Sequence, residues 1–323
     1  MTSLRTWVGA VAVLIAASPI AGAQTYPTRA IQVISPFTAG NANDTVGRVV
    51  LEQVSRQIGQ SFVIENRPGG GGTLGATQAA KAEPDGYTLL LHSSSLSSQA
   101  VLHKTLPYDP VRDFAPIAMF GIQPSVLVVS PSKGYNSVAD LIAAAKAKPG
   151  ALNFASAGIG AASHMAAERL RLAAKIDVQH IPFRGPVEAF TEVMTGRIDY
   201  YFLPISPAMP HILDGKLKAL AVSTPKRAQA LPNVPTVAEA GYPDAQYLFW
   251  GGLSGPSKLP RAVVDKLHGE IQKALELPAV NDKLAKLGVE LMPMSVEQCE
   301  AFFRDDLAAT VKLAKDANIT PTN

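Results

Sequence analysis

Apolar and polar positions along this chain alternate in a way that predicts repeated strand-and-helix units. In the first unit, residues 31–34 predict a short buried strand, residues 36–43 a turn-rich loop, and residues 46–50 an amphipathic helix. Asp44 lies where this helix should begin, and its side-chain oxygen is expected to cap the first turn by accepting a main-chain amide. A loop that leads into a helix start gathers unpaired N–H groups at the positive end of the helix dipole, which favours a bound anion.

The same unit recurs along the chain and predicts the fold class. Residues 87–92 form a nearly continuous apolar run, typical of a strand buried in a parallel sheet, and lead into three serines at residues 93–95. Residues 152–155 predict another strand, and a second turn-rich loop follows over residues 156–160 before a helix. Strands that alternate with helices predict an α/β protein with parallel sheets, in which ligands bind at the carboxyl ends of the strands.

The two turn-rich loops open separate blocks of this alternation. We therefore expect two lobes that face each other across a cleft, with one loop on each side. Because both loops follow a strand and precede a helix, each would present main-chain amides to the cleft. Two such anion sites suit a molecule that carries a carboxylate at each end.

Composition removes several classes of protein. The chain has 323 residues, enough for two domains, and its 47% hydrophobic and 17% charged residues are typical of a globular protein. The net charge is +3 and no Lys/Arg cluster stands out, so no nucleic-acid partner is expected. The six histidines have no close metal-ligand spacing, so we expect no metal and no other cofactor. Cys299 is the only cysteine, which excludes a disulfide within the chain.

Residues 1–23 predict a secretory signal peptide. Arg5 supplies the positive charge, residues 8–17 form an apolar run shorter than a bilayer span, and Ala21-Gly22-Ala23 matches a cleavage site. We therefore expect the mature chain to begin at Gln24 and to reside in the periplasm.

Many short motifs occur in a fixed order along most of the mature chain. They are YPTR at 26–29, PFTAG at 36–40, ENRPG at 65–69, PDGYTLL at 84–90, LPYDP at 106–110, DFAPI at 113–117, KAKPG at 146–150, SH at 163–164, GKLKALAV at 215–222 and LPNVPTVAEAG at 231–241. On these motifs the chain resembles the periplasmic substrate-binding proteins of tripartite tricarboxylate transporters.

The resemblance implies a periplasmic-binding-protein-like α/β fold with two lobes around a central ligand cleft. It implies that residues 24–124 belong to the first lobe, residues 125–224 to the second, and residues 225–323 again to the first. A protein of this family is a receptor rather than an enzyme. It is expected to work as a monomer that captures a small carboxylate and delivers it to the membrane permease subunits of its transporter.

The resemblance also implies where the ligand binds. One carboxylate is expected on the first loop and beside the serines at 93–95, and the other end of the ligand on loops of the second lobe. Carried onto this sequence, the expected ligand-binding residues are Phe37, Thr38, Ala39, Gly40, Asn41, Ser93, Ser94, Ser95, Ser156, Ala157, Gly158, Gly160, Ala161, Ser163, Phe183 and Leu203.

Some positions depart from the family pattern and change the expected ligand. After Gly40, the first loop has Asn41 and Ala42 where relatives have glycines, and a positive φ would be costlier for an alanine. The second loop carries Ala and Ile at positions that are often Ser or Asn, and Leu203 stands where many relatives have an aspartate. These changes favour a dicarboxylate with an apolar middle. An aromatic monocarboxylate, with its ring against Phe37 or Trp250, is the alternative.

Other functions fit the sequence less well. Residues 156–163 imitate a dinucleotide-binding fingerprint, but Ser163 replaces its third glycine. Ser163 and His164 suggest a hydrolase or lyase, yet adjacent helical residues point about 100° apart and do not pair as nucleophile and base. Arg184 is either a carboxylate clamp or part of a surface ion pair. A ligand sensor for a signalling system would use the same pocket, so the sequence leaves sensing and transport open.

Overall fold

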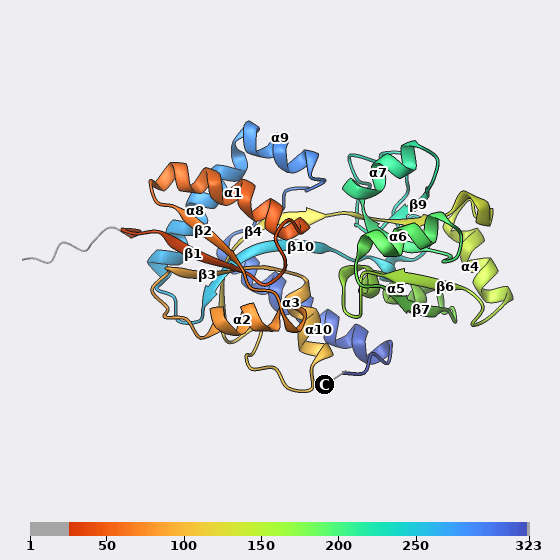
Figure 1. Ribbon diagram of the computed structural model, residues 1–323, viewed down its shortest axis with the longest axis horizontal. Helices are drawn as coiled ribbons and strands as arrows, with labels where there is room; N and C mark the ends of the chain where they lie inside the picture. The colour runs from red at the N-terminus through yellow and green to blue at the C-terminus, as the bar shows by residue number, and fades with distance from the viewer. Residues whose placement is uncertain (1–25, 322–323) are drawn as a thin grey trace, which may run out of the picture.

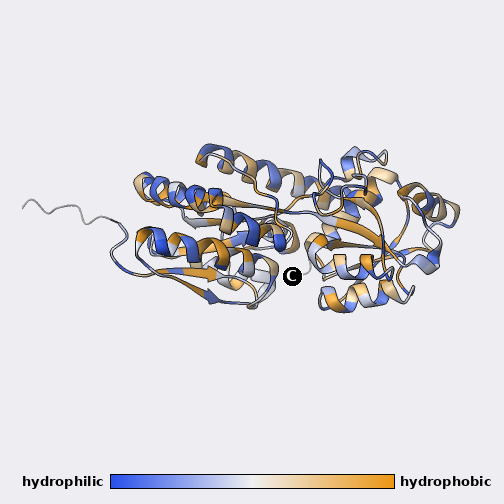
Figure 2. Ribbon diagram, turned by 90° about the horizontal axis from the view of Figure 1, so that it is seen from above, coloured by the Kyte–Doolittle hydropathy of each residue, from blue (hydrophilic) through white to orange (hydrophobic). Residues whose placement is uncertain are grey.

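The computed structural model describes residues 26–321, and the expected signal peptide lies outside this range. Two lobes lie side by side along the longest axis of the molecule, and each is built around strands covered by helices (Figure 1). Apolar residues line the strands and the inner faces of the helices, while the outer faces are hydrophilic (Figure 2). Within the described range, no helix is both long and apolar enough to cross a membrane.

The first lobe contains a five-stranded sheet. Its strands, in spatial order, are β2 (Phe62–Asn66), β1 (Ile31–Ser35), β3 (Thr88–Ser93), β10 (Phe249–Pro256) and β4 (Phe114–Gln123). β1 is parallel to β2 and β3, as expected, whereas β10 is antiparallel to both of its neighbours. β10 runs the other way because the chain enters it from the second lobe.

Helices cover both faces of this sheet. One face packs against α1 (Ala42–Ile58), α8 (Arg261–Glu276) and α9 (Pro278–Lys286), and the other against α2 (Thr73–Ala80), α3 (Ser95–Leu102) and α10 (Val296–Asp316). The alternation along β3 follows from strand geometry, since Leu89 and Leu91 enter one core and Leu90 the other. A single-turn 3₁₀ helix, Gly70–Gly72, leads into α2.

The second lobe is organised around β5 (Ser125–Val129). β5 lies between β8 (Tyr201–Pro204) and β9 (Lys218–Val222), while β6 (Asn153–Ser156) pairs with β7 (Gln179–Pro182). The Ala155 amide donates to the carbonyl of Tyr200 at 3.0 Å, which joins β6 to the residue just before β8. Helices α4 (Val138–Ala147) and α5 (Ala162–Ala174) cover one face of these strands, and α6 (Pro186–Met194) and α7 (Ile205–Leu213) cover the other.

Among residues 26–321, three segments connect the lobes. β4 continues through Pro124 into β5, the chain after β9 returns into β10, and α10 extends from the first core to the second. On α10, Phe303 is buried in the first lobe and Leu313 in the core of the second. The lobes are therefore linked by two strand crossings and by one long helix.

The returning segment between β9 and β10 packs against the second lobe. Val237 and Tyr247 lie in its core with α4 and α5, and Leu231 lies in the core beside α6 and α7. The sequence interpretation assigned everything after residue 224 to the first lobe. Because this segment buries its apolar side chains against the second lobe, we propose that the second lobe extends from residue 125 to about Leu248.

Phe303 anchors α10 in the first lobe and offers a test of this packing. It is 3% exposed, and its ring contacts those of His92 and Trp250. We expect Phe303→Ala to lower the free energy of unfolding in urea by about 3–5 kcal/mol, because it leaves a cavity in a packed core. Val311 on the same helix is 49% exposed, so Val311→Ala should change that energy by less than about 0.5 kcal/mol. Equal losses in the two variants would contradict this arrangement.

Candidate functional site

The first loop, residues 36–41, connects β1 to α1, and the amides of Gly40, Asn43 and Asp44 around its end bond to side chains of the protein itself. Asn41, not Asp44, is the N-terminal cap, since its Oδ1 accepts the amides of Asn43 at 3.0 Å and Asp44 at 3.1 Å. The prediction of an Asp44 cap was therefore wrong. Both residues favour helix starts, and the helix begins one turn earlier than expected, at Ala42.

Asp44 instead lies inside the first turn of α1 and holds the loop in place. Its carboxylate accepts the Gly40 amide at 2.9 Å, Arg48 Nε at 3.0 Å and Asn66 Nδ2 at 3.0 Å. Burial alone would raise the pKa of this carboxyl, but the hydrogen bonds from Arg48, Gly40 and Asn66 lower it below its ordinary value. An ionised carboxylate of the protein thus already occupies the positive end of α1.

The missing glycines of the first loop cause no backbone strain. Gly40 has a φ of +79°, whereas Ala42 has ordinary helical geometry. The loop therefore needs the left-handed conformation only where the chain still has glycine, and the expected penalty at Ala42 is absent. Phe37, Thr38 and Ala39 complete the loop, with Thr38 and Ala39 exposed and Phe37 half-buried.

The three serines after β3 lie next to the crossing between the lobes. Ser93 Oγ and Ser95 Oγ are 2.8 Å apart, and the Ser94 amide donates to the carbonyl of Trp250 at 3.1 Å. Tyr247 Oη lies 3.3 Å from Ser94 Oγ. A cavity of about 10 Å³, large enough for roughly one water molecule, is lined both by this serine end and by the first loop. Its lining includes Phe37, Gly72, His92, Ser95, Gln99 and Tyr108.

The second loop, residues 156–161, is held by side chains from its own ends. Ser156 Oγ accepts the Gly158 amide at 3.1 Å, and Ser163 Oγ accepts the Ala157 amide at 3.0 Å. His164 Nδ1 accepts the Gly160 amide at 3.0 Å. These three hydrogen bonds fix the loop and direct its polar side chains inward.

The start of α5 differs from the start of α1. Its N-cap residue is Ala161, no side chain between residues 26 and 321 hydrogen-bonds to the cap, and no acidic residue lies in the first turn. The amides of Ala162, Ser163 and His164 belong to the turn whose N–H groups have no partner within a helix. The second lobe therefore offers an anion a helix N-terminus that the protein does not fill.

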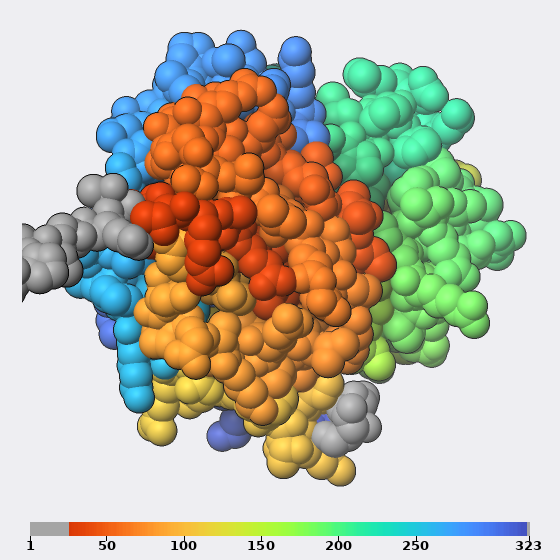
Figure 3. All heavy atoms as spheres, turned by 60° about the vertical axis from the view of Figure 1, so that its left-hand side comes forward, coloured from red at the N-terminus to blue at the C-terminus, as the bar shows by residue number. Residues whose placement is uncertain are grey.

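The second loop lies at the boundary between the lobes. Gly160 has a φ of +76°, and a Cβ there would come within 1.9 Å of Leu102 Cδ1 at the end of α3. Only glycine allows the loop to approach α3 this closely. Figure 3 shows the same boundary from one side, where the red-orange atoms of the early chain border the green second lobe.

The remaining predicted residues fall into two groups. The Phe183 amide donates to the Ser156 carbonyl at 3.0 Å, which holds Phe183 beside the second loop, and Arg184 is exposed next to it. Leu203 has no exposed surface and packs in the core of the second lobe. Trp250 is likewise fully buried, in the core of the first lobe. The structure thus brings Phe183 to the site, but neither Leu203 nor Trp250 presents surface to it.

Some residues at this boundary escaped prediction. Leu102 lies against Gly160 of the second loop and Tyr247 contacts Ser94, both from distant parts of the chain, and no local sequence pattern identifies such contacts. His180 on β7 lies 2.7 Å from Ser156 Oγ, measured from Nε2. A single histidine of this kind belongs to no sequence motif, so one sequence does not reveal that it lies beside the second loop.

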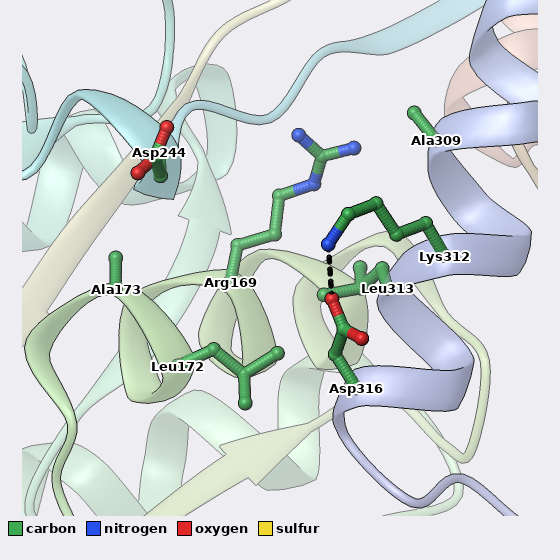
Figure 4. Close-up of a pocket in the computed structure, with 8 residues that line it drawn as sticks. All are labelled: Arg169, Leu172, Ala173, Asp244, Ala309, Lys312, Leu313 and Asp316. Atoms are coloured by element: carbon green, nitrogen blue, oxygen red, sulfur yellow. Dashed lines mark hydrogen bonds and ion pairs between the residues drawn. The ribbon is translucent and has the colours of Figure 1, made fainter.

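A separate cavity of about 350 Å³ lies between α5, the turn at residues 243–245 and α10. Figure 4 shows Arg169 extending into it opposite Lys312, which pairs with Asp316. It contains none of the predicted site residues. Across the described part of the chain, no group of three or more His, Cys, Asp or Glu side chains is arranged to hold a metal ion.

Comparison with known proteins identifies relatives over nearly the whole chain. Residues 46–319 match the model of the tripartite tricarboxylate transporter family receptor. Protein BugT of Bordetella pertussis is 34% identical over 312 residues, which cover 95% of each chain.

Two solved structures with bound ligands are also similar. Rpa4515 of R. palustris with adipate has a TM-score of 0.81 and 30% identity, covering 92% of this chain and 99% of its own. MatC of Rhodopseudomonas palustris with bound malate has a TM-score of 0.77 and 30% identity, covering 89% of this chain and 99% of its own. These matches confirm the two-lobed periplasmic-binding fold, and the chain belongs to the tripartite tricarboxylate transporter receptor family.

Proposed function

We propose that this protein is a periplasmic receptor that binds a dicarboxylate between its lobes and delivers it to the permease of a tripartite tricarboxylate transporter. The observation that carries the proposal is the start of α5, which lies beside the lobe boundary and has no side-chain cap on its main-chain amides. A carboxylate there would gain charge-assisted hydrogen bonds and the favourable end of the helix dipole.

The relatives support a dicarboxylate as the ligand. One of the two similar structures contains adipate and the other malate. Adipate has a carboxylate at each end of an unsubstituted chain, whereas malate carries a hydroxyl group between its carboxylates. The side chains between the two loops therefore decide which kind of middle this receptor accepts.

Those side chains are mostly apolar. Ile159 is 49% exposed on the second loop, and Ala161, Phe37 and Phe183 are half-buried at the loops. Leu203 does not contribute, since it lies in the core. The apolar middle therefore rests on Ile159 and the two phenylalanines rather than on Leu203. Arg184 is exposed beside Phe183, and only its main-chain amide contacts a carboxylate among residues 26–321, that of Glu188 at 3.4 Å, so its guanidinium is available for the second carboxylate.

The arrangement of Ser163 and His164 supports a receptor rather than a hydrolase. Each accepts a different loop amide, Ala157 for Ser163 and Gly160 for His164, so neither activates the other. A nucleophile and its base would have to share a hydrogen bond. A role as ligand sensor would use the same loops and differs only in the membrane partner.

The ligand is tested by calorimetry with adipate, terephthalate, benzoate, citrate and glutamate. We expect adipate or terephthalate to bind most tightly. A buried hydroxyl or ammonium group without a partner costs about 1–3 kcal/mol, so citrate and glutamate should bind roughly 10- to 100-fold more weakly. Tightest binding to citrate or glutamate would contradict the apolar middle. Conversion of any bound ligand into product would contradict the receptor function.

The anion site is tested by removing one amide while keeping the helix. Ala162 is the first residue of α5 and follows Ala161, which has an extended backbone at φ −60° and ψ 154°. Proline is tolerated at the first position of a helix and after an extended residue. We expect Ala162→Pro to weaken adipate binding about 10- to 100-fold, the value of a hydrogen bond to a charged group, without lowering the unfolding temperature of the free protein.

Ala42→Pro is the matched variant, because Ala42 is the first residue of α1 and follows Asn41 at φ −67° and ψ 164°. The ionised Asp44 carboxylate already lies at that helix start and would repel a bound anion, so this change should weaken binding less. A larger effect of Ala42→Pro than of Ala162→Pro would assign the main carboxylate site to the first lobe instead.

A further inference from the structure

Two histidines are stacked directly beneath the second loop. The rings of His164 on α5 and His180 on β7 lie 4.0 Å apart between centroids and 9° from parallel. Phe154 stacks on His180 at 4.8 Å and lies 6.3 Å from His164 between ring centroids. His164 is 4% exposed, so its ring is enclosed between the loop and the core.

Each histidine holds one end of the loop. His164 Nδ1 accepts the Gly160 amide at 3.0 Å, and His180 Nε2 lies 2.7 Å from Ser156 Oγ, which in turn accepts the Gly158 amide. Because an N–H group donates to Nδ1 of His164, that nitrogen must be unprotonated. The loop geometry therefore requires a neutral His164 with its proton on Nε2.

The charged groups around the pair determine where an added proton would go. His164 Nε2 lies 3.7 Å from Glu168 Oε1, and Glu168 Oε2 accepts Arg171 Nε at 2.6 Å. Burial opposes the charge on Glu168, but its contacts with His164 and Arg171 lower its pKa below the ordinary value. Just before β8, the buried Tyr200 is neutral because burial raises the pKa of its hydroxyl.

Only one ring of the stacked pair can carry a charge at a time, since two positive charges 4.0 Å apart repel each other. Burial and the neighbouring His164 lower the pKa of His180 from 6.5 to about 4. Glu168 Oε1 lies 3.7 Å from His164 Nε2, so a positive charge on His164 would have a carboxylate beside it. A proton added to Nδ1 of His164 would face the N–H of Gly160.

We propose that the His164–His180 pair positions the second ligand loop, and that protonation of His164 releases Gly160 and weakens ligand binding. The proposal rests on the proposed function, because it assigns a role to the loop at which the carboxylate binds. The receptor would then hold its ligand at neutral pH and release it more readily in acid. His164 and His180 are positioning residues in this scheme, since they act through the loop backbone.

The pair also predicts the direction of a stability change. Between pH 6.5 and about pH 4, the unfolded chain takes up a proton at His180 that the folded protein does not accept. Unfolding is therefore favoured as the pH falls through this window. This contribution to stability is fully present above pH 6.5 and is lost towards pH 4.

The first measurement follows the Gly160 amide by NMR in the ligand-free protein as the pH is lowered from about 7.5 to 5. We expect its proton resonance to move upfield as the hydrogen bond to Nδ1 is lost. In His164→Asn, Oδ1 takes the place of Nδ1 without titrating, so the resonance should stay in position. If the chemical shift of the Gly160 amide proton in the wild-type protein does not change with pH, the inference is overturned, whatever ligand binds.

The second measurement compares adipate affinity between variants at each pH, so that the ionisation of adipate itself cancels in the ratio. His164→Leu removes the acceptor and should bind about fivefold more weakly at pH 7.5, the value of one ordinary hydrogen bond. His164→Asn should restore most of this loss and should bind better than wild type at pH 5.5. Equal pH dependence in wild type and His164→Asn would overturn the inference.

His268→Asn serves as the control. His268 lies on α8 of the first lobe, where its Nδ1 is 2.8 Å from the Ile117 carbonyl, so this variant should follow the wild-type pH dependence. If no variant binds adipate at any pH, the proposed ligand is wrong, while the Gly160 resonance still decides the role of the histidines.

Discussion

The hydrogen bonding of main-chain amides at two helix starts is the constraint on which the binding site depends. At α1, folding satisfies these amides internally, because Asn41 caps the helix and Asp44 takes the Gly40 amide. At α5, the side chains of Ser163 and His164 turn back to the loop, and Ala161 offers no cap. The lobes are built from similar strand-and-helix units, yet of these two helix starts only that of α5 lacks a side-chain cap and an acidic residue in its first turn.

The sequence predicted the elements well where local pattern decides them. Strands β1, β3 and β6 and the loops after them lie where apolar runs and turn residues indicated, since burial on one or both faces controls the pattern. The helix start at α1 was displaced because Asn41 and Asp44 both favour caps, and only the folded loop decides between them. Local patterns thus gave the fold class and left the hydrogen-bond partners open.

Contacts between distant segments were beyond such patterns. Leu203 was expected at the site from its position in the family, but it pairs with Val126 in the sheet and its side chain enters the core. Gly160 approaches Leu102, which lies 58 residues earlier in the chain, so no window of local sequence contains both. The packing of residues 228–247 against the second lobe likewise depends on apolar side chains whose partners on α4 to α7 lie far away in the sequence.

The hydrogen bonds beneath the second loop extend beyond the ligand site to the segment that connects the lobes. Glu168, which faces His164, also holds Arg171, and Arg171 Nη2 donates to the carbonyl of Ala317 at 3.3 Å, just after the end of α10. α10 packs on α3 in the first lobe and on α5 in the second, so any rotation of the lobes must change the contacts between α5 and α10. The cavity between these two helices, with Arg169 and Lys312 in its lining, provides room for such a change. A ligand that fixes the start of α5 would thereby bias the contacts at the other end of the same helix, which is the physical requirement for coupling binding to lobe closure.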